Sequence, residues 1–221
     1  MVHIGTANSF GHGSKKNPGN EHTPFGAAMY RMDYIDSKLT AQKMLLERHK
    51  REGLPVVIIN PTFMIGPYDT GPSSGKMLIG LYEGAIPAYS TGGKNFVCAT
   101  DVAVAAVNAL KMGRKGECYI AGNENLEFKE FFRKACTVLN KPFRMRAAPE
   151  LLILLLGAFN SVLAKATGKP PRISFTMARM STIGQYFSSK KAQKELNMPQ
   201  TPIEEGIRQS IEWFKVNGYI K

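Results

Sequence analysis

Residues 33–61, which read DYIDSKLTAQKMLLERHKREGLPVVIINP, decide the fold class. Apolar residues alternate with charged ones over residues 33–52, and Gly53 stands where a helix commonly ends, so this part predicts a helix. Residues 56–59 are β-branched and apolar throughout, which is typical of a parallel strand covered on both faces. A helix followed by a buried strand is half of a βαβ unit, so the sequence predicts an α/β protein.

Further elements flank this stretch. Residues 2–4 form an apolar run that breaks at Gly5 and Thr6, as at the end of a buried strand. A polar surface loop is expected at residues 11–23. Asp101 is expected to cap a helix with its carboxylate. The remaining predicted elements are strands at 96–100 and 117–121 and helices at 76–83, 101–110, 127–139, 149–166 and 203–217.

The composition narrows the class of protein. The 221 residues carry a formal net charge of +12. Lysine and arginine are nevertheless scattered, without the interleaved aromatic residues of a single-strand-binding groove, so we expect no nucleic-acid partner. The three cysteines show no CxxC spacing, which predicts neither a zinc site nor a disulfide framework and suits a cytoplasmic protein.

One strongly apolar run lies at residues 151–163, where Asn160 and Ser161 interrupt it. The run is shorter than the ~20 residues that a membrane span needs. We therefore interpret it as a buried or amphipathic helix, in preference to a helix that contacts a membrane.

The motif YIDSK at residues 34–38 has the spacing of a proton-transfer pair. Positions i and i+4 place Tyr34 and Lys38 on one face of the predicted helix. A tyrosine phenol ordinarily has a pKa of about 10, and a lysine ammonium beside a phenol favours the phenolate. Such a phenol can give a proton to a carbonyl oxygen or take one from an alcohol. By itself the motif is weak, because a solvated tyrosine and lysine one turn apart are common on helices.

The neighbouring strand ends strengthen this interpretation. In an open parallel sheet, sites form at the carboxyl ends of the strands. The strand that ends at Gly5-Thr6 and the strand that ends at Asn60-Pro61 should therefore meet beside the helix. Thr6 offers a hydroxyl that can bind a substrate oxygen there; the alternative is that it only caps the strand end.

The order of these features resembles the extended short-chain dehydrogenase/reductases, the superfamily of NAD-dependent nucleotide-sugar epimerases and dehydratases. VHIGTANSFG at residues 2–11 is similar to the family's strand that ends in Ser or Thr, and NPTFMIGP at residues 60–67 is similar to its NPxxxxGP segment. Residues 92–103 resemble a later segment of the family. Similarity to the dihydroflavonol-reductase-like branch lies at residues 168–171, 186–192, 195–196 and 211–214.

The resemblance implies a role for named residues. Thr6, Tyr34 and Lys38 match the family's catalytic trio, and Tyr34 and Lys38 would also contact the cofactor, NADP or NAD. In the family, the backbone of the NPxxxxGP segment lines the nicotinamide. The residues that match this lining are Pro61, Thr62, Phe63 and Met64.

The resemblance also implies an architecture, a partial Rossmann-like parallel sheet whose N-terminal half is missing, with a mostly helical C-terminal substrate domain. We expect residues 1–125 to be the second half of the nucleotide-binding domain with substrate-loop insertions, and residues 126–221 to bind substrate. No GxxGxxG turn for the pyrophosphate occurs in the sequence. We therefore expect a fragment that is inactive alone, which an in-frame strand and glycine-rich turn encoded upstream of Met1 would explain.

Three functions remain open. The first is an NAD(P)-dependent oxidoreductase that acts on a small-molecule carbonyl or alcohol, and the dihydroflavonol-reductase-like tail favours it. The second is a nucleotide-sugar epimerase or dehydratase, for which Lys76 and Arg172 are the candidate phosphate ligands. The third is a non-catalytic fragment or scaffold. A homodimer through paired helices is compatible with all three.

Overall fold

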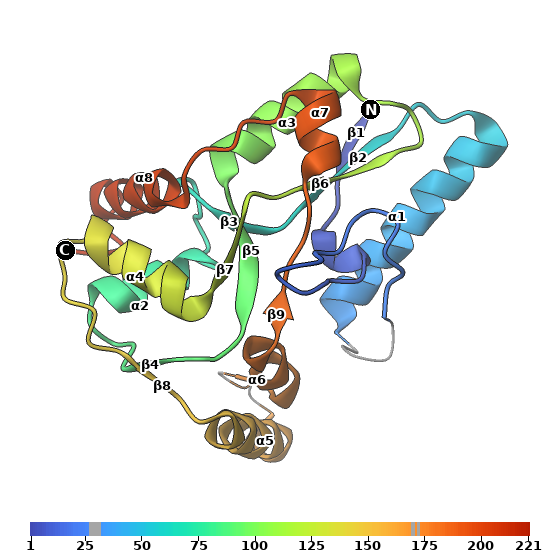
Figure 1. Cartoon of the computed structure of the whole chain (residues 1–221). Helices are drawn as coiled ribbons and strands as arrows, with labels where there is room; N and C mark the ends of the chain where they lie inside the picture. The colour runs from blue at the N-terminus through green and yellow to red at the C-terminus, as the bar shows by residue number, and fades with distance from the viewer. Residues whose placement is uncertain (27–31, 169–170, 172) are drawn as a thin grey trace.

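The computed structural model describes residues 1–26, 32–168, 171 and 173–221 (Figure 1). Its first sheet has three parallel strands in the order β1-β2-β6. These strands are β1 (Val2–Ile4), β2 (Val57–Pro61) and β6 (Cys118–Ala121). Every residue of β2 is buried, as predicted for a central parallel strand.

A second sheet of four strands is built around β5 (Gly93–Cys98). Its other members are β3 (Phe63–Ile65), β7 (Glu124–Glu127) and β9 (Gly184–Gln185). β5 runs parallel to β3 and β9 and antiparallel to β7. The chain passes from the first sheet to the second at Thr62. The predicted division at residue 125 stays a prediction, and the second sheet takes strands from both sides of it.

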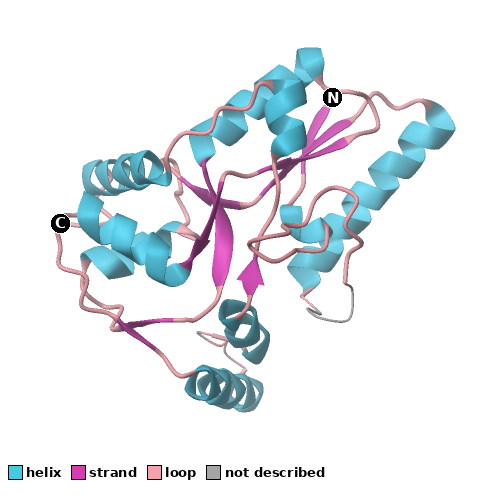
Figure 2. Ribbon diagram, viewed as in Figure 1, coloured by secondary structure: helices cyan, strands magenta, loops and turns pink. Residues whose placement is uncertain are grey.

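Helices cover both faces of the first sheet (Figure 2). Alternation along the strand sends Val57 and Ile59 toward α3 (Ala99–Met112) and α7 (Lys190–Leu196). The intervening Ile58 faces α1 (Asp33–Glu52), whose Leu45 and Leu46 pack against the same cluster. This double cover is the physical reason why β2 has no polar residue before Asn60.

The second core lies between the second sheet and three helices, α2 (Gly75–Tyr82), α4 (Phe128–Val138) and α8 (Ile203–Val216). Phe96 of β5 is at its centre and is fully buried. Its ring stacks on that of Phe131, with the two centroids 4.2 Å apart. The apolar spacing of α4 and α8 directs their phenylalanines into this core.

Two details of the α3 region differ from the sequence predictions. The expected strand at 96–100 runs instead from Gly93 to Cys98, and Ala99 and Thr100 already belong to the helix. Asp101 does not begin the helix. Its buried carboxylate accepts hydrogen bonds from the backbone N and Oγ1 of Thr201, at 2.8 and 2.7 Å. The partner lies 100 residues away, so local capping rules could not identify it.

The predicted loop at residues 11–23 is confirmed, since it contains no helix or strand. Gly13 and Gly19 attach it to a late segment, because both donate their N–H to the carbonyl of Tyr186 at 3.0 Å. Before it, residues Ala7–Ser9 form the short 3-10 helix η1. Two two-residue strands, β4 (Ala88–Tyr89) and β8 (Arg146–Ala147), pair in parallel outside the main sheets.

The apolar run forms α5 (Glu150–Thr167), next to α6 (Phe175–Thr182). Of the two expectations for this run, a buried helix was wrong, because only Gly157 is buried and large apolar side chains are exposed, whereas an amphipathic helix stays a prediction. Periodicity alone could not show that these apolar side chains are left uncovered by the described part of the chain.

Candidate active site at the strand ends

The carboxyl ends of β1 and β2 lie side by side, as the sequence predicted. Ile4 pairs with Ile59, and Gly5 donates its N–H to the carbonyl of Ile59 at 2.8 Å. Thr6 then follows one strand while Asn60 and Pro61 end the other. Polar groups from two segments far apart in sequence are thereby brought to one edge of the sheet.

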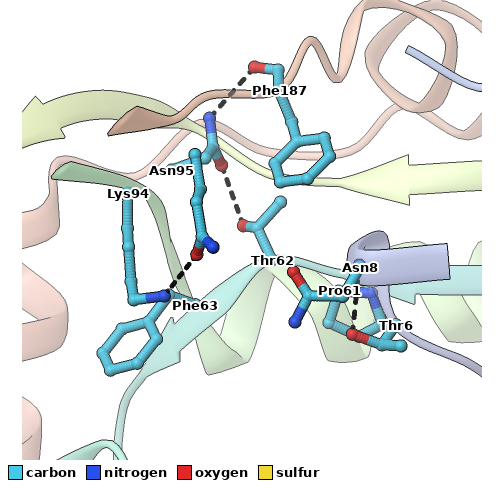
Figure 3. Close-up of a pocket in the computed structure, with 9 residues that line it drawn as sticks. Thr6, Asn8, Pro61, Thr62, Phe63, Lys94, Asn95 and Phe187 are labelled. Atoms are coloured by element: carbon cyan, nitrogen blue, oxygen red, sulfur yellow. Dashed lines mark hydrogen bonds between the residues drawn. The ribbon is translucent and has the colours of Figure 1, made fainter. Parts of the chain in front are cut away.

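A cavity of about 50 Å³ opens at this edge (Figure 3). Such a volume holds roughly four water molecules, enough for the reacting end of a substrate. Three elements converge on it: the end of β1, the β2–β3 junction and the region where β5 meets β9. The lining residues are Thr6, Asn8, Pro61, Thr62, Phe63, Lys94, Asn95, Gln185 and Phe187.

The hydroxyl of Thr6 is oriented by local structure. Thr6 caps η1, and its Oγ1 accepts a hydrogen bond from the backbone N of Asn8 at 3.3 Å. The residue is 7% exposed, so its orientation is restricted. Because a hydroxyl both accepts and donates, this capping contact leaves the Thr6 O–H free to donate to a ligand. Capping and ligand binding are therefore compatible roles for one side chain.

Asn60 fixes the position of Thr6 relative to α1. Its buried Nδ2 donates to the Thr6 carbonyl at 3.0 Å and to Gln42 Oε1 at 2.7 Å. Gly5 permits this approach, because a Cβ at that position would lie 2.6 Å from Asn60 Nδ2. The amide therefore connects the end of β1, the end of β2 and the helix that carries Tyr34 and Lys38.

The Lys38 side chain reaches the end of β1. Its Nζ donates to the carbonyl of Ile4 at 3.3 Å, two residues before Thr6. The ammonium also acts on His3 of the same strand, where burial first and the Lys38 charge second lower the imidazole pKa. Tyr34 lies one turn earlier on α1 and is 57% exposed, outside the residues that line the cavity.

The structure thus brings Thr6, Pro61, Thr62 and Phe63 into one cavity, with Lys38 at the adjoining strand end. Met64 does not line it and is 40% exposed, because successive side chains of β3 point to opposite faces. Its predicted contact with nicotinamide, made through the backbone, stays a prediction. Of the two candidate phosphate ligands, Lys76 is exposed on α2 and Arg172 lies outside the described residues.

Sequence reasoning missed Lys94, the cation that faces the cavity. Lys94 is largely buried in β5, and burial lowers the pKa of its ammonium to about 8. Its Nζ donates to Gln185 Oε1 at 2.6 Å and lies 5.4 Å from the centroid of the Phe63 ring. Neither partner carries a negative charge. A lysine inside a buried strand was the signal that could have identified it, since lysine is rarely buried without a pair.

Asn95 forms the inner wall of the cavity, as Figure 3 shows. Its Oδ1 accepts from Thr62 Oγ1 at 2.8 Å, and its Nδ2 donates to Asn125 Oδ1 at 2.8 Å and to the Phe187 carbonyl at 3.1 Å. The side chain is 1% exposed and its hydrogen bonds are satisfied on both sides. We therefore assign it a positioning role, which holds the β2–β3 junction against the late segment.

The residues present fit one end of a dinucleotide. Pro61 and Phe63 provide an apolar wall for a flat ring, while Thr6 and Lys38 provide polar groups beside it. Ser9 Oγ, buried in η1, has no hydrogen-bond partner among the described residues, which leaves polar capacity at the same edge. The sequence contains no glycine-rich turn for the pyrophosphate. The cavity residues present therefore fit the nicotinamide and its ribose.

Comparison with known proteins agrees with this geometry. Residues 1–122, more than half of the chain, match the NAD dependent epimerase/dehydratase family. The chain belongs to this family. A dihydroflavonol-reductase-like relationship is also found, because a putative dihydroflavonol 4-reductase from Synechocystis sp. is 28% identical over 193 residues. That alignment covers 85% of this chain and 56% of the relative. The chain spans about half to three fifths of the length of the curated relatives that it matches.

Solved structures show the same fold. The protein gox2253 superposes with a TM-score of 0.83 at 30% identity, over 100% of this chain and 67% of gox2253. A dTDP-glucose 4,6-dehydratase from Bacillus anthracis in complex with NAD gives a TM-score of 0.71 at 20% identity, over 99% of this chain and 62% of that enzyme. This chain is thus a Rossmann-type α/β protein and belongs to an NAD-dependent family that includes reductases and dehydratases.

Proposed function

We propose that the protein is an NAD(P)-dependent oxidoreductase that reduces a small-molecule carbonyl or oxidises the corresponding alcohol. One observation carries the proposal. Thr6 and the segment 61–63 line a single cavity, and the Lys38 ammonium reaches the carbonyl of Ile4 at the strand end that leads into it. The name of the putative dihydroflavonol 4-reductase supports the same reaction class.

In this proposal the cofactor and each of three residues have a defined role. NAD(P), when bound, supplies or accepts the hydride. Thr6 donates its free O–H to the substrate oxygen and holds it at the cavity. Tyr34 gives a proton to that oxygen in reduction and takes it back in oxidation. Lys38 favours the phenolate through its positive charge and contacts the ribose.

Because Tyr34 is exposed, the proposal requires its side chain to move toward the cavity. Tyr34 and Lys38 are both on α1, one turn apart, and Lys38 already points to the strand end. Rotation about the Tyr34 side-chain bonds, which takes picoseconds to nanoseconds for exposed residues, must bring the hydroxyl toward Lys38. The substrate and cofactor would hold it there by hydrogen bonding.

The test compares Tyr34→Phe with Tyr68→Phe. Tyr68 is 80% exposed and lies outside the site, so it controls for the loss of a surface hydroxyl. Carbonyl-dependent oxidation of NADPH and NADH is followed in the 221-residue chain and in the longest in-frame product of its gene. We expect Tyr34→Phe to lower kcat by roughly 10²–10⁴-fold without unfolding, and Tyr68→Phe to leave it unchanged. Equal activity of both variants would refute the proposed role.

A second candidate function, a nucleotide-sugar epimerase or dehydratase, is favoured by Lys94. This cation faces the cavity with only neutral partners. An anionic group of a substrate would give its charge a partner of opposite sign. Nucleoside diphosphate binding, measured by calorimetry, separates the two candidates. Binding that Lys94→Met abolishes would support the second function, whereas turnover of neutral carbonyls with no diphosphate binding would support the first.

A further inference from the structure

The outer face of α5 is an exposed apolar surface. Of its 18 residues only Gly157 is buried, and the mean hydropathy of the helix is 1.5. Within the described part of the chain, it is the one helix that is long and apolar enough to cross a membrane. Seven large apolar side chains, each at least 47% exposed, recur at helical spacing: Leu151, Leu152, Leu155, Leu156, Phe159, Val162 and Leu163.

α6 packs against the opposite side of α5, and in Figure 1 it separates α5 from the rest of the protein. The contact is close, because a Cβ on Gly157 would lie 2.5 Å from that of Ala178. Ser161 Oγ accepts a hydrogen bond from the Phe175 N–H at 2.9 Å, and so satisfies a donor at the start of α6. We call α5 and α6 together the α5–α6 hairpin. Phe175 and Met177 of α6 add to the exposed apolar surface.

Positive charge is concentrated in the longer segment 141–189, which contains the hairpin. Between residues 141 and 189 the sequence has seven basic residues and one acidic residue, Glu150, which is a surplus of six and half of the chain's +12. The basic residues are Lys141, Arg144, Arg146, Lys165, Lys169, Arg172 and Arg179. In the described part of the segment, Arg146 precedes α5, Lys165 is in its last turn and Arg179 is on α6. An apolar surface with cations nearby is complementary to a bilayer that contains anionic lipids.

We infer that the α5–α6 hairpin binds the surface of an anionic membrane and inserts its apolar face among the lipids. Helix α5 packs closely against α6 on one side, so only its other side is free to contact lipid. It therefore lies along the interface instead of crossing. A second copy of the chain explains the observations less well, because two surfaces with the same positive surplus repel each other. This inference is independent of the proposed chemistry.

The apolar contribution is tested by flotation with vesicles of phosphatidylcholine, with and without phosphatidylglycerol. The variant is Leu155→Gln with Phe159→Gln, and the matched control is Val107→Gln with Leu110→Gln on the exposed face of α3. All four side chains are more than half exposed, so both variants should fold. We expect the α5 variant to lose at least about tenfold in partitioning to the anionic vesicles and the α3 variant to bind as the wild type does.

The charge contribution is tested with Arg144→Gln and Arg146→Gln against Lys111→Gln and Lys115→Gln, which remove the same charge from the α3 end. Each arginine removed should weaken binding to the anionic vesicles by about fivefold, while the lysine variants change little. Equal losses in both pairs would show that only overall charge matters and would overturn the inference.

Insertion depth gives a readout that does not depend on loss of binding. Phe159→Trp places an indole on the hairpin, and Val107→Trp places one on α3 in the same Trp213 background. Lipids brominated on their acyl chains should quench the added fluorescence of the first variant only. Absence of vesicle binding by the wild type, absence of quenching, or a lipid-free dimer that the α5 variant dissociates would each overturn the inference, the last by assigning the face to a second copy.

Discussion

Replacing Lys94 with methionine is predicted to stabilise the protein and weaken its binding of anionic ligands. Burial lowers the pKa of this ammonium from 10.5 to about 8. The difference corresponds to a cost of about 3 kcal/mol for keeping the charged form in the folded state. The bond to Gln185 and the contact with Phe63 offset it by about 1 kcal/mol each. We therefore expect Lys94→Met to raise the free energy of unfolding by about 1 kcal/mol at neutral pH.

The pH dependence distinguishes this cause from better packing. Below pH 8 the ammonium is charged in the folded and in the unfolded chain, so the burial cost is fully present. Between about pH 8 and 10.5 the unfolded chain binds more protons at Lys94 than the folded chain does, so this group makes stability rise with pH. The advantage of Lys94→Met should therefore be largest below pH 8 and should reverse by about pH 10.5, where the burial cost is gone and the neutral amine keeps its bond to Gln185.

Urea unfolding, followed by the fluorescence of Trp213, measures both effects. The control is Lys191→Met, because Lys191 is also largely buried but forms an ion pair with Glu117 at 2.7 Å. Its loss removes this ion pair and the hydrogen bond to the Cys118 carbonyl at 2.7 Å, so this variant should be less stable than the wild type by about 1–2 kcal/mol. If Lys94→Met were destabilising to the same degree, or its effect did not vary between pH 7 and pH 10.5, the argument from burial would be refuted.

Three further predictions concern the geometry of the site. Lys38→Met should raise the pKa of His3 in an NMR titration, because it removes a nearby positive charge, whereas Lys43→Met on the exposed side of α1 should not; an unchanged His3 would contradict the placement of Lys38. Asn95→Ala should lower the free energy of unfolding in urea by about 2 kcal/mol, since it removes the buried hydrogen bonds that join the β2–β3 junction, β7 and the late segment, and a loss below about 1 kcal/mol would argue against its positioning role. Asp101→Ala should cost about 2 kcal/mol by the same measurement and increase amide exchange at the start of α8, whereas faster exchange only within α3 would favour local capping.

The elements around the site were predictable because their signals are local. A few neighbouring residues are enough to identify each element. The helix α1 shows alternating apolar and charged residues, the strand β2 shows a β-branched run, and the strand ends are marked by breaks at Gly5 and Asn60. Parallel pairing then places Thr6 beside Pro61 without further information.

The missed features depend on contacts between distant segments. Lys94 faces the cavity because β5 pairs with β9, about 90 residues later, and Asp101 is engaged by Thr201 across 100 residues. A rule that uses only neighbouring residues cannot identify partners so far away in the sequence. For α5, the spacing of apolar residues identified the helix correctly but carries no information on whether another part of the chain covers it.

Gln185 and Phe187 supply the last wall of the cavity, late in the sequence. Their position affects when the cavity forms during synthesis and how its lining can change in evolution. On the ribosome, all three strands of the first sheet emerge well before these residues, so a nascent or prematurely terminated chain has the strand ends without an enclosed pocket. Codons for 184–187 can also mutate without altering Thr6, Tyr34 or Lys38. If the proposed function holds, substitutions at 184–187 would change which substrate is accepted and leave the three proposed reacting groups unchanged.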